Sequence, residues 1–280
     1  MENKLNLNHI ESFHEFGYTL GIFLPRAYDN YLNKTLGSTK GKIGSSSLFY
    51  FSPAHTEELR HVWDIPSENQ LIQQYYQFSQ PNFTQNGWTP PPLKLQYENS
   101  VFTYQKPILT INNKNTIEWD KGLFSYFPVD VLDMLFTKLK DYYQIVYIRP
   151  PETNESKYQR DTGVRTTNIG DIELIRSKHP DVLYIGDVLK EYPNKTYNEI
   201  QMMFLANSNH HISSGGGDAF IAGYFGGELL MYIPHPNIVP QGGRGVWKSN
   251  SWLELLSGSK VTSFHSYDEV LNYVNQWVHI

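Results

Sequence analysis

A run of small residues in the last third of the chain has the composition of an anion-binding turn. Residues 213–220 read Ser-Ser-Gly-Gly-Gly-Asp-Ala-Phe and follow a short apolar segment at 210–213 that predicts a strand. Glycine lets backbone N–H groups approach a ligand closely, and the start of a following helix favours negative charge. A phosphate or diphosphate suits such a turn. The alternative is a tight turn in which Asp218 only caps the helix.

The spacing of these glycines excludes two common nucleotide-binding motifs. The run matches neither G-x-G-x-x-G nor G-x-x-x-x-G-K-[ST], so dinucleotide-binding and P-loop functions are not indicated. The ligand would therefore be held by bare backbone in a different setting.

Other polar residues follow predicted strands or open a helix and could reach the same ligand. Arg149 ends the segment Gln144–Ile148, where a guanidinium can hold a phosphate through two parallel hydrogen bonds. Its alternative role is that of a solvated residue at the start of a polar loop. Glu199 could accept hydrogen bonds from ribose hydroxyls, or serve only in the capping box that Thr196 predicts. The remaining candidates are Asn113 and Lys114 after a strand, and Arg244 in the loop 241–248.

Alternating strand and helix patterns place these residues at one edge of a parallel sheet. From Gln105 onward, strands are predicted at 107–111, 144–148, 181–185, 210–213, 228–233 and 260–264, with helices between and after them at 128–143, 170–178, 196–206, 219–225 and 267–278. Such alternation is typical of an α/β domain with helices on both faces of a Rossmann-like sheet. Ligands of open parallel sheets bind outside the carboxyl ends of the strands.

The first hundred residues have a different pattern and predict a smaller, mainly helical region. Helix is predicted over 10–36 with a break at Pro25, then a strand at 47–51 and helices at 53–63 and 67–78. The proline-rich segment 86–92 predicts an extended connection. We therefore expect an N-terminal region at 1–100 and the sheet domain at 101–280.

The composition of the chain limits the kinds of partner it can bind and the compartment in which we expect it. A net charge of −5 and 18% charged residues argue against nucleic acid, because a surface that follows phosphates needs an excess of Lys and Arg. With no cysteine, the chain cannot form disulfides or thiolate metal sites. No signal peptide or apolar run long enough to span a membrane is present, so we expect a cytoplasmic protein.

The region between Tyr197 and His235 resembles the C-terminal half of GT-B type glycosyltransferases. In those enzymes a helix, a strand, a small-residue turn, a helix and a strand build the donor pocket, and the segment Ile-Val-Tyr-Ile-Arg-Pro at 145–150 resembles the strand-end Arg of fucosyltransferase-like members. The resemblance implies a nucleotide-diphosphate sugar as donor and a glycan or other hydroxyl compound as acceptor. It also implies that the donor phosphates are faced by Arg149 and by Gly215, Gly216, Gly217, Asp218, Ala219 and Phe220.

The implied transfer needs a base but no cofactor. Backbone amides and Arg would neutralise the leaving diphosphate without a metal, and no Asp-x-Asp motif or metal-ligand spacing is evident. An inverting transfer needs a general base from the N-terminal part, for which the candidates are His55, Asp29 and Glu15.

Two alternatives remain open at this stage. A sugar-nucleotide epimerase or hydrolase would use the same donor pocket without an open acceptor site. A non-catalytic sugar- or nucleotide-binding module would hold the ligand with its aromatic residues and not turn it over.

Overall fold

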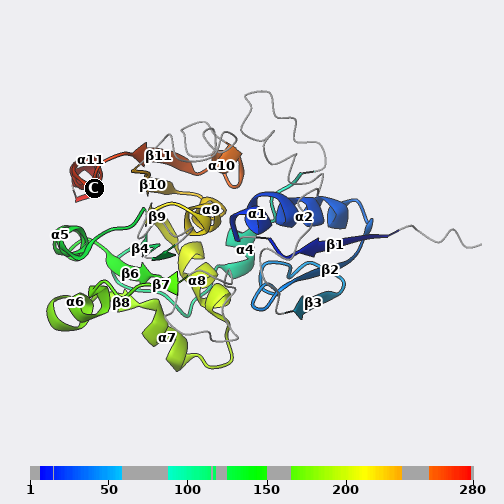
Figure 1. The fold of residues 1–280 in the computed structure, drawn as a ribbon, viewed down its shortest axis with the longest axis horizontal. Coiled ribbons are helices and arrows are strands. Elements are labelled where there is room, and N and C mark those ends of the chain that lie inside the picture. The colour runs from blue at the N-terminus through cyan, green and yellow to red at the C-terminus, as the bar shows by residue number, and fades with distance from the viewer. Residues whose placement is uncertain are drawn as a thin grey trace, which may run out of the picture.

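The computed structural model describes residues 7–14, 16–58, 88–114, 116–117, 125–149, 165–234 and 252–278. These residues form two parallel sheets with helices packed on them (Figure 1). The larger sheet has six strands in the order β11-β10-β9-β4-β6-β8, and every neighbouring pair is parallel. Its strands are β4 (Ile108–Asn112), β6 (Gln144–Ile148), β8 (Leu183–Tyr184), β9 (Ser208–Ser213), β10 (Glu228–Tyr232) and β11 (Lys260–Phe264).

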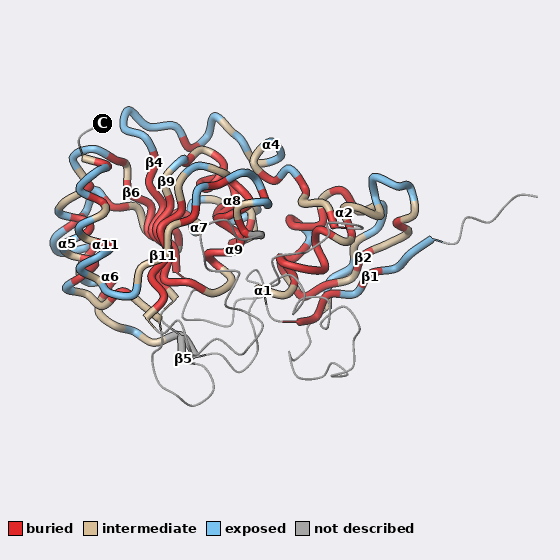
Figure 2. Tube along the Cα trace, turned by 90° about the horizontal axis from the view of Figure 1, so that it is seen from above, coloured by how far each residue is buried: buried red, intermediate tan, exposed pale blue. Residues whose placement is uncertain are grey.

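Helices cover both faces of this sheet, so its strands are buried on both sides (Figure 2). On one face lie α5 (Val129–Leu139), α6 (Asp171–Lys178), α11 (Tyr267–Tyr273) and the 3-10 turn η2 (Val274–Val278). On the other lie α7 (Ile185–Glu191), α8 (Tyr197–Ala206) and α9 (Gly217–Gly223). The shorter described elements are α4 (Leu93–Tyr97), which packs on α8, α10 (Trp252–Leu255), and the antiparallel pair of β5 (Thr116–Ile117) and β7 (Arg165–Thr166).

The predicted α/β sheet domain is confirmed, and most of its elements lie within a few residues of their predicted positions. The strands expected at 107–111, 144–148, 210–213, 228–233 and 260–264 correspond to five of the six observed strands. The strand expected at 181–185 is shorter, because β8 ends at Tyr184 and α7 begins directly after it. The capping box at Thr196 and Glu199 is present at the start of α8.

The N-terminal region contains a second parallel sheet that the sequence pattern did not predict. Its strands β1 (Asn8–Ser12), β2 (Leu36–Lys42) and β3 (His55–Glu58) pair in chain order. Between β1 and β2 the chain is helical from α1 (Phe16–Tyr18) through the π-helical turn η1 (Thr19–Phe23) to α2 (Leu24–Leu32). The region is therefore a small α/β unit and not a mainly helical one.

Three local predictions in this region are wrong. The aromatic run at 47–51 forms turns, since Leu48, Phe49 and Phe51 pack into the core that this region shares with α9. The helix predicted at 53–63 is replaced in its described part by the edge strand β3. No break occurs at Pro25, because it stands in the first turn of α2, where its missing N–H is tolerated. The helix predicted at 67–78 lies outside the described residues.

The π-helical turn explains how helical backbone continues through proline. The N–H group of Leu24 donates to the carbonyl of Thr19, a π-type bond. The next residue, Pro25, has no N–H to offer to the carbonyls of Leu20 and Gly21, which precede it by five and four residues. Two buried carbonyls inside the helical segment therefore need donors from elsewhere.

Two aromatic side chains supply those donors, and one of them joins the two regions. The hydroxyl of Tyr224, which follows α9, donates to the carbonyl of Leu20 at 2.5 Å. The indole N–H of Trp88, from the proline-rich segment, donates to the carbonyl of Gly21 at 2.9 Å. Tyr224 is 1% exposed and Trp88 5%, so neither bond competes with bulk water. The N-terminal unit is thus fixed against the end of α9 by the Tyr224 hydrogen bond as well as by apolar packing.

Removing the hydroxyl of Tyr224 tests this connection. Tyr224→Phe leaves the Leu20 carbonyl buried without its donor, so we expect it to lower the free energy of unfolding by about 1–3 kcal/mol. Denaturant unfolding measures the change. Tyr142→Phe, which removes a hydroxyl from an exposed ring, is the control and should change the free energy by less than about 0.5 kcal/mol. Equal effects of the two substitutions would contradict the assignment.

Candidate functional site

The carboxyl ends of β4 and β9 bring a lysine to the glycine turn. Beyond the strands, the Ser214 N–H donates to the Asn112 carbonyl at 3.0 Å, and the Lys114 N–H donates to the Ser214 hydroxyl at 2.7 Å. The hydroxyl of Ser125 donates to the carbonyls of Ser214 and Tyr232, which fixes the turn against β10. The predicted strand-end residue Lys114 therefore lies beside the predicted glycine turn.

The backbone of this turn has a conformation that requires glycine. Gly215 has φ of +87°, and Gly216 has φ of +72° with ψ of −158°, a combination that only glycine commonly adopts. A Cβ at position 216 would lie 2.9 Å from Cδ and 3.2 Å from Nζ of Lys114. The Lys114 ammonium therefore lies against bare backbone, and a side chain on Gly216 would displace it.

The helix that follows presents only its first residues at this edge. The N–H groups of Ala219 and Phe220 both bond to the Gly216 carbonyl, at 3.2 and 3.3 Å, and their side chains are buried in the core. The structure thus places these two residues in the interior and not at the predicted phosphate site. Within the described part of the chain, the N–H groups of Gly216 and Gly217 make no hydrogen bond. These partly exposed amides are available to an anion.

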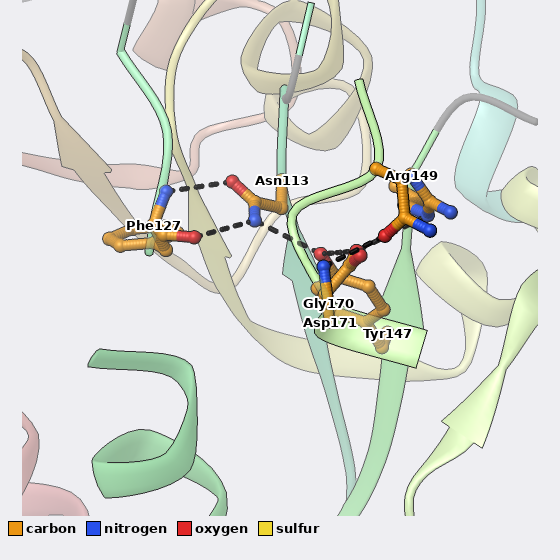
Figure 3. Close-up of polar contacts among 7 residues, drawn as sticks. Asn113, Phe127, Tyr147, Arg149, Gly170 and Asp171 are labelled. Atoms are coloured by element: carbon orange, nitrogen blue, oxygen red, sulfur yellow. Dashed lines mark hydrogen bonds and ion pairs between the residues drawn. The ribbon is translucent and has the colours of Figure 1, made fainter. Parts of the chain in front are cut away.

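Arg149 is at its predicted strand end but is buried and ion-paired. Its side chain is 2% exposed, and its Nε lies 3.2 Å from Oδ2 of Asp171, which is fully buried at the start of α6 (Figure 3). Its guanidinium carbon also lies 5.9 Å from the ring centroid of Tyr184. The expectation of a solvated Arg at the start of a loop is wrong. Its predicted contact with donor phosphates stays a prediction.

Asn113 belongs to the same buried network and has a structural role. Its amide donates to the Phe127 carbonyl at 2.9 Å and accepts from the Phe127 N–H at 2.8 Å, which clamps the segment before α5 to β4 (Figure 3). It also donates to the Tyr147 hydroxyl at 3.0 Å, which in turn donates to Asp171 at 2.6 Å. Burial, with the Asp171 charge, raises the pKa of Tyr147 well above its usual value, so the phenol stays a donor. With its side chain 0% exposed, Asn113 does not face the predicted ligand.

Glu199 makes the capping contacts that its position predicts. Its carboxylate accepts from the Thr196 N–H at 3.2 Å and lies 3.1 Å from the ammonium of Lys195. A role toward ribose stays a prediction. Asp218 is buried at 9% exposure within the first turn of α9. Arg244 and Glu15 lie outside the described residues.

Two of the predicted bases are held in structural contacts. Both ring nitrogens of His55 are engaged, Nδ1 with the Thr39 hydroxyl at 2.7 Å and Nε2 with the Ser45 hydroxyl at 3.0 Å. Asp29 accepts from the Thr89 hydroxyl at 3.0 Å, near the end of α2 that leads away from the carboxyl edge of the small sheet. Neither residue is brought to the glycine turn by the fold.

The structure brings a histidine that the sequence analysis did not consider, His14, to a strand end of the small sheet. It lies directly beyond β1, at the carboxyl edge of the small sheet, and is 7% exposed. Its ring stacks on that of Phe23 with centroids 4.9 Å apart. Recognising 8–12 as a strand would have exposed His14 as a strand-end residue. The alternation of buried and exposed side chains along β1 is too short a signal to do so alone.

A hollow of about 600 Å³ opens between α5 and α6, apart from the glycine turn. Its polar lining residues are Tyr126, Asp130 and Asp133, and Asp133 already pairs with Lys178 and His179. A lining that carries carboxylates repels phosphate. The glycine turn is therefore the better candidate for an anion.

The chain has the fold of GT-B glycosyltransferases, two parallel α/β units of unequal size. The glycosyl transferase family 9 structure from Veillonella parvula superposes with a TM-score of 0.50 at 8% identity, over 99% of this chain and 91% of that one. The heptosyltransferase TibC, described as dodecameric and iron-containing and in complex with ADP-D-β-D-heptose, gives 0.51 at 11% identity, over 98% and 76%. At these identities the likeness shows the fold alone. No family model matches the sequence, and no curated protein is similar enough to match it.

Two further features of the described residues bear on partners. None of their helices is long and apolar enough to cross a membrane. No group of three or more His, Asp or Glu among them is arranged to hold a metal ion.

The buried ion pair should be strongly coupled. Asp171→Asn leaves the Arg149 charge buried without its carboxylate, so we expect a loss of about 3–5 kcal/mol in the free energy of unfolding, and a similar loss for Arg149→Met. The double variant Arg149→Met, Asp171→Asn should lose clearly less than the sum. Denaturant unfolding of the four chains measures this cycle.

An exposed ion pair provides the control for that cycle. Asp187 lies 3.4 Å from Arg176, with side chains 46% and 61% exposed, so Asp187→Asn should cost at most about 1 kcal/mol. Strictly additive losses at 149 and 171 would show that the two groups do not stabilise each other.

Proposed function

We propose that this chain is a glycosyltransferase that takes its sugar from a nucleotide-diphosphate donor and transfers it to a hydroxyl group of a glycan or similar acceptor. The observation that carries the proposal is the contact between the Lys114 ammonium and the glycine-only backbone at Gly216, at the carboxyl edge of a parallel sheet. This edge is where open parallel sheets bind ligands. The GT-B fold supports the same assignment, and so does the nucleotide sugar that TibC is described as binding.

The arrangement suits the departure of a diphosphate. In our proposal the N–H groups of Gly216 and Gly217 and the Lys114 ammonium hold the diphosphate oxygens. Charge develops on these oxygens as the bond to the anomeric carbon breaks, and fixed donors there stabilise the transition state without reorganising. Donors of this kind replace a divalent cation, so we propose a transfer that needs no metal.

The acceptor would enter from the side of the N-terminal unit. The helical segment that begins at Phe16 packs against α9, so the chain that leaves the carboxyl end of β1 reaches the glycine turn. An acceptor hydroxyl held on the N-terminal side would attack the anomeric carbon from the face opposite the departing diphosphate. We therefore propose inversion at that carbon.

A thermal-shift series with UDP, GDP, CDP and ADP and their sugars tests the donor site. One nucleotide should raise the melting temperature of the wild-type chain, because a ligand that binds only the folded state stabilises it. Lys114→Met should lower the affinity for that nucleotide by about tenfold to a hundredfold, since a hydrogen bond to a charged group contributes about 1.5–3 kcal/mol. Gly216→Ala should lower the same affinity as well, because the added Cβ displaces Lys114.

Gly258→Ala is the matched control for the backbone effect. Gly258 has φ of +74°, similar to Gly216, but a Cβ there would meet nothing within 4 Å. This variant should lose stability and keep its nucleotide affinity. If no nucleotide stabilises the wild type, or if Lys114→Met and Gly216→Ala bind it unchanged, the donor site is not at this turn. Binding without any turnover of a nucleotide sugar would favour a binding module instead.

A further inference from the structure

His14 lies on the segment that connects the small sheet to the glycine turn. This segment leaves β1 at Ser12 and enters α1 at Phe16. A Cβ on Gly217 would lie 2.7 Å from Cδ1 of Phe16, so the two chain segments are in direct contact. His14 is thus two residues from the residue that touches the glycine turn. It is on the N-terminal side, where the proposed acceptor would lie.

A nearby hydrogen bond and a ring stack fix the chain around His14. The hydroxyl of Ser12 donates to the hydroxyl of Thr19 at 2.9 Å in the buried interior, which closes the chain around position 14. The Phe23 ring stacks on the imidazole at an interplanar angle of 14°. Phe23 reaches this position from the π-helical turn, a feature that in other proteins often marks functional sites.

The ring nitrogens of His14 are not used by the fold. Neither nitrogen makes a hydrogen bond to any group within the described ranges, although the residue is only 7% exposed. His55, the other histidine near the small sheet's interior, has both nitrogens bonded. The His14 nitrogens are also not among the side-chain atoms that the fold seals from solvent without a partner, as Nε2 of His211 is, so they remain open to a ligand.

The charges around His14 keep the ring neutral. Lys42, 3% exposed at the carboxyl end of β2, faces it from the neighbouring strand, and the Tyr18 ring lies 6.2 Å away between centroids. Burial, together with the Lys42 charge, lowers the pKa of His14 to about 4. At neutral pH the imidazole is therefore unprotonated and one nitrogen carries a free lone pair.

We propose that His14 is the general base that accepts the proton of the acceptor hydroxyl in the transfer. This inference rests on the proposed function. The acceptor oxygen forms a bond to the anomeric carbon while the bond from that carbon to the diphosphate oxygen breaks. The hydroxyl proton passes to the His14 imidazole, and the electron pair of the broken bond leaves with the nucleoside diphosphate. The imidazolium then returns the proton to solvent.

The test uses water as acceptor, so that no glycan needs to be known. Release of nucleoside diphosphate from UDP-glucose, GDP-mannose, CDP-glucose and ADP-glucose is measured for the wild-type chain and for His14→Gln. We expect His14→Gln to lower the release rate by about a hundredfold or more, the usual contribution of a general base. The affinity for the matching nucleoside diphosphate, measured by thermal shift, should stay within about twofold of the wild type, because the base does not hold the leaving group.

His9→Gln is the matched control, since His9 is an exposed histidine on β1, the strand that precedes His14, and bonds only the Ser38 hydroxyl among described groups. It should keep the wild-type rate. A His14→Gln chain that binds nucleotide normally and releases it at more than a third of the wild-type rate would overturn the role of His14 and leave the proposed function intact. A wild-type chain that neither binds nor cleaves any of these compounds would overturn the proposed function, and this role with it.

The pH dependence gives a second measurement that needs no variant. The base acts unprotonated, so the rate should be level at neutral pH and fall as pH drops through the pKa of about 4. Histidine resonances followed by NMR over the same range should show a ring that stays neutral down to about pH 5, besides that of the fully buried His211, and that disappears in His14→Gln. Titration of His14 near its ordinary value of about 6.5 would contradict the burial and charge on which the role depends.

Discussion

The structure depends on how a proline is accommodated in the first helical segment. Pro25 leaves two buried carbonyls without helical donors, and the side chains that supply these donors, Tyr224 and Trp88, come from distant parts of the sequence. The same π-helical turn directs Phe23 onto the His14 ring. One local irregularity thus docks the N-terminal unit onto α9 and also places an aromatic ring against His14, two residues before Phe16, which contacts the glycine turn.

The sheet domain was readable from sequence because its strands are apolar and its helices carry clear start signals. Segments such as Gln144–Ile148 and Glu228–Tyr232 are buried almost throughout, and Thr196 with Glu199 marks a helix start without ambiguity. The small sheet gave no such signal. Its central strand reads Leu-Gly-Ser-Thr-Lys-Gly-Lys, and its edge strand reads His-Thr-Glu-Glu. These segments form strands because they pair with neighbouring strands and pack on the core, and these interactions override their weak intrinsic preference for strand.

The candidate site, too, was predicted only in part from the sequence. Strand-end logic located Lys114, Arg149 and the glycine turn, because position along the chain determines the edge at which a residue lies. Position along the chain does not show which of these side chains are buried in the interior. Asn113 and Phe220 proved to be buried in the fold, and Arg149 proved to be ion-paired, because such contacts join residues far apart in sequence. His14 shows the opposite case. Only the three-dimensional structure reveals that its ring nitrogens make no hydrogen bond to the described residues.

Helix α9 performs two tasks within a few residues. The candidate anion turn leads into its first residue, Gly217, while Ala219 and Phe220 lie in the core shared with the N-terminal unit. An anion held at the turn would also stiffen the surface on which the other half of the molecule rests. The two events are then thermodynamically linked, so occupancy of the turn would slow amide hydrogen exchange in the helical segment from Phe16 to Leu32, although no ligand atom touches most of it.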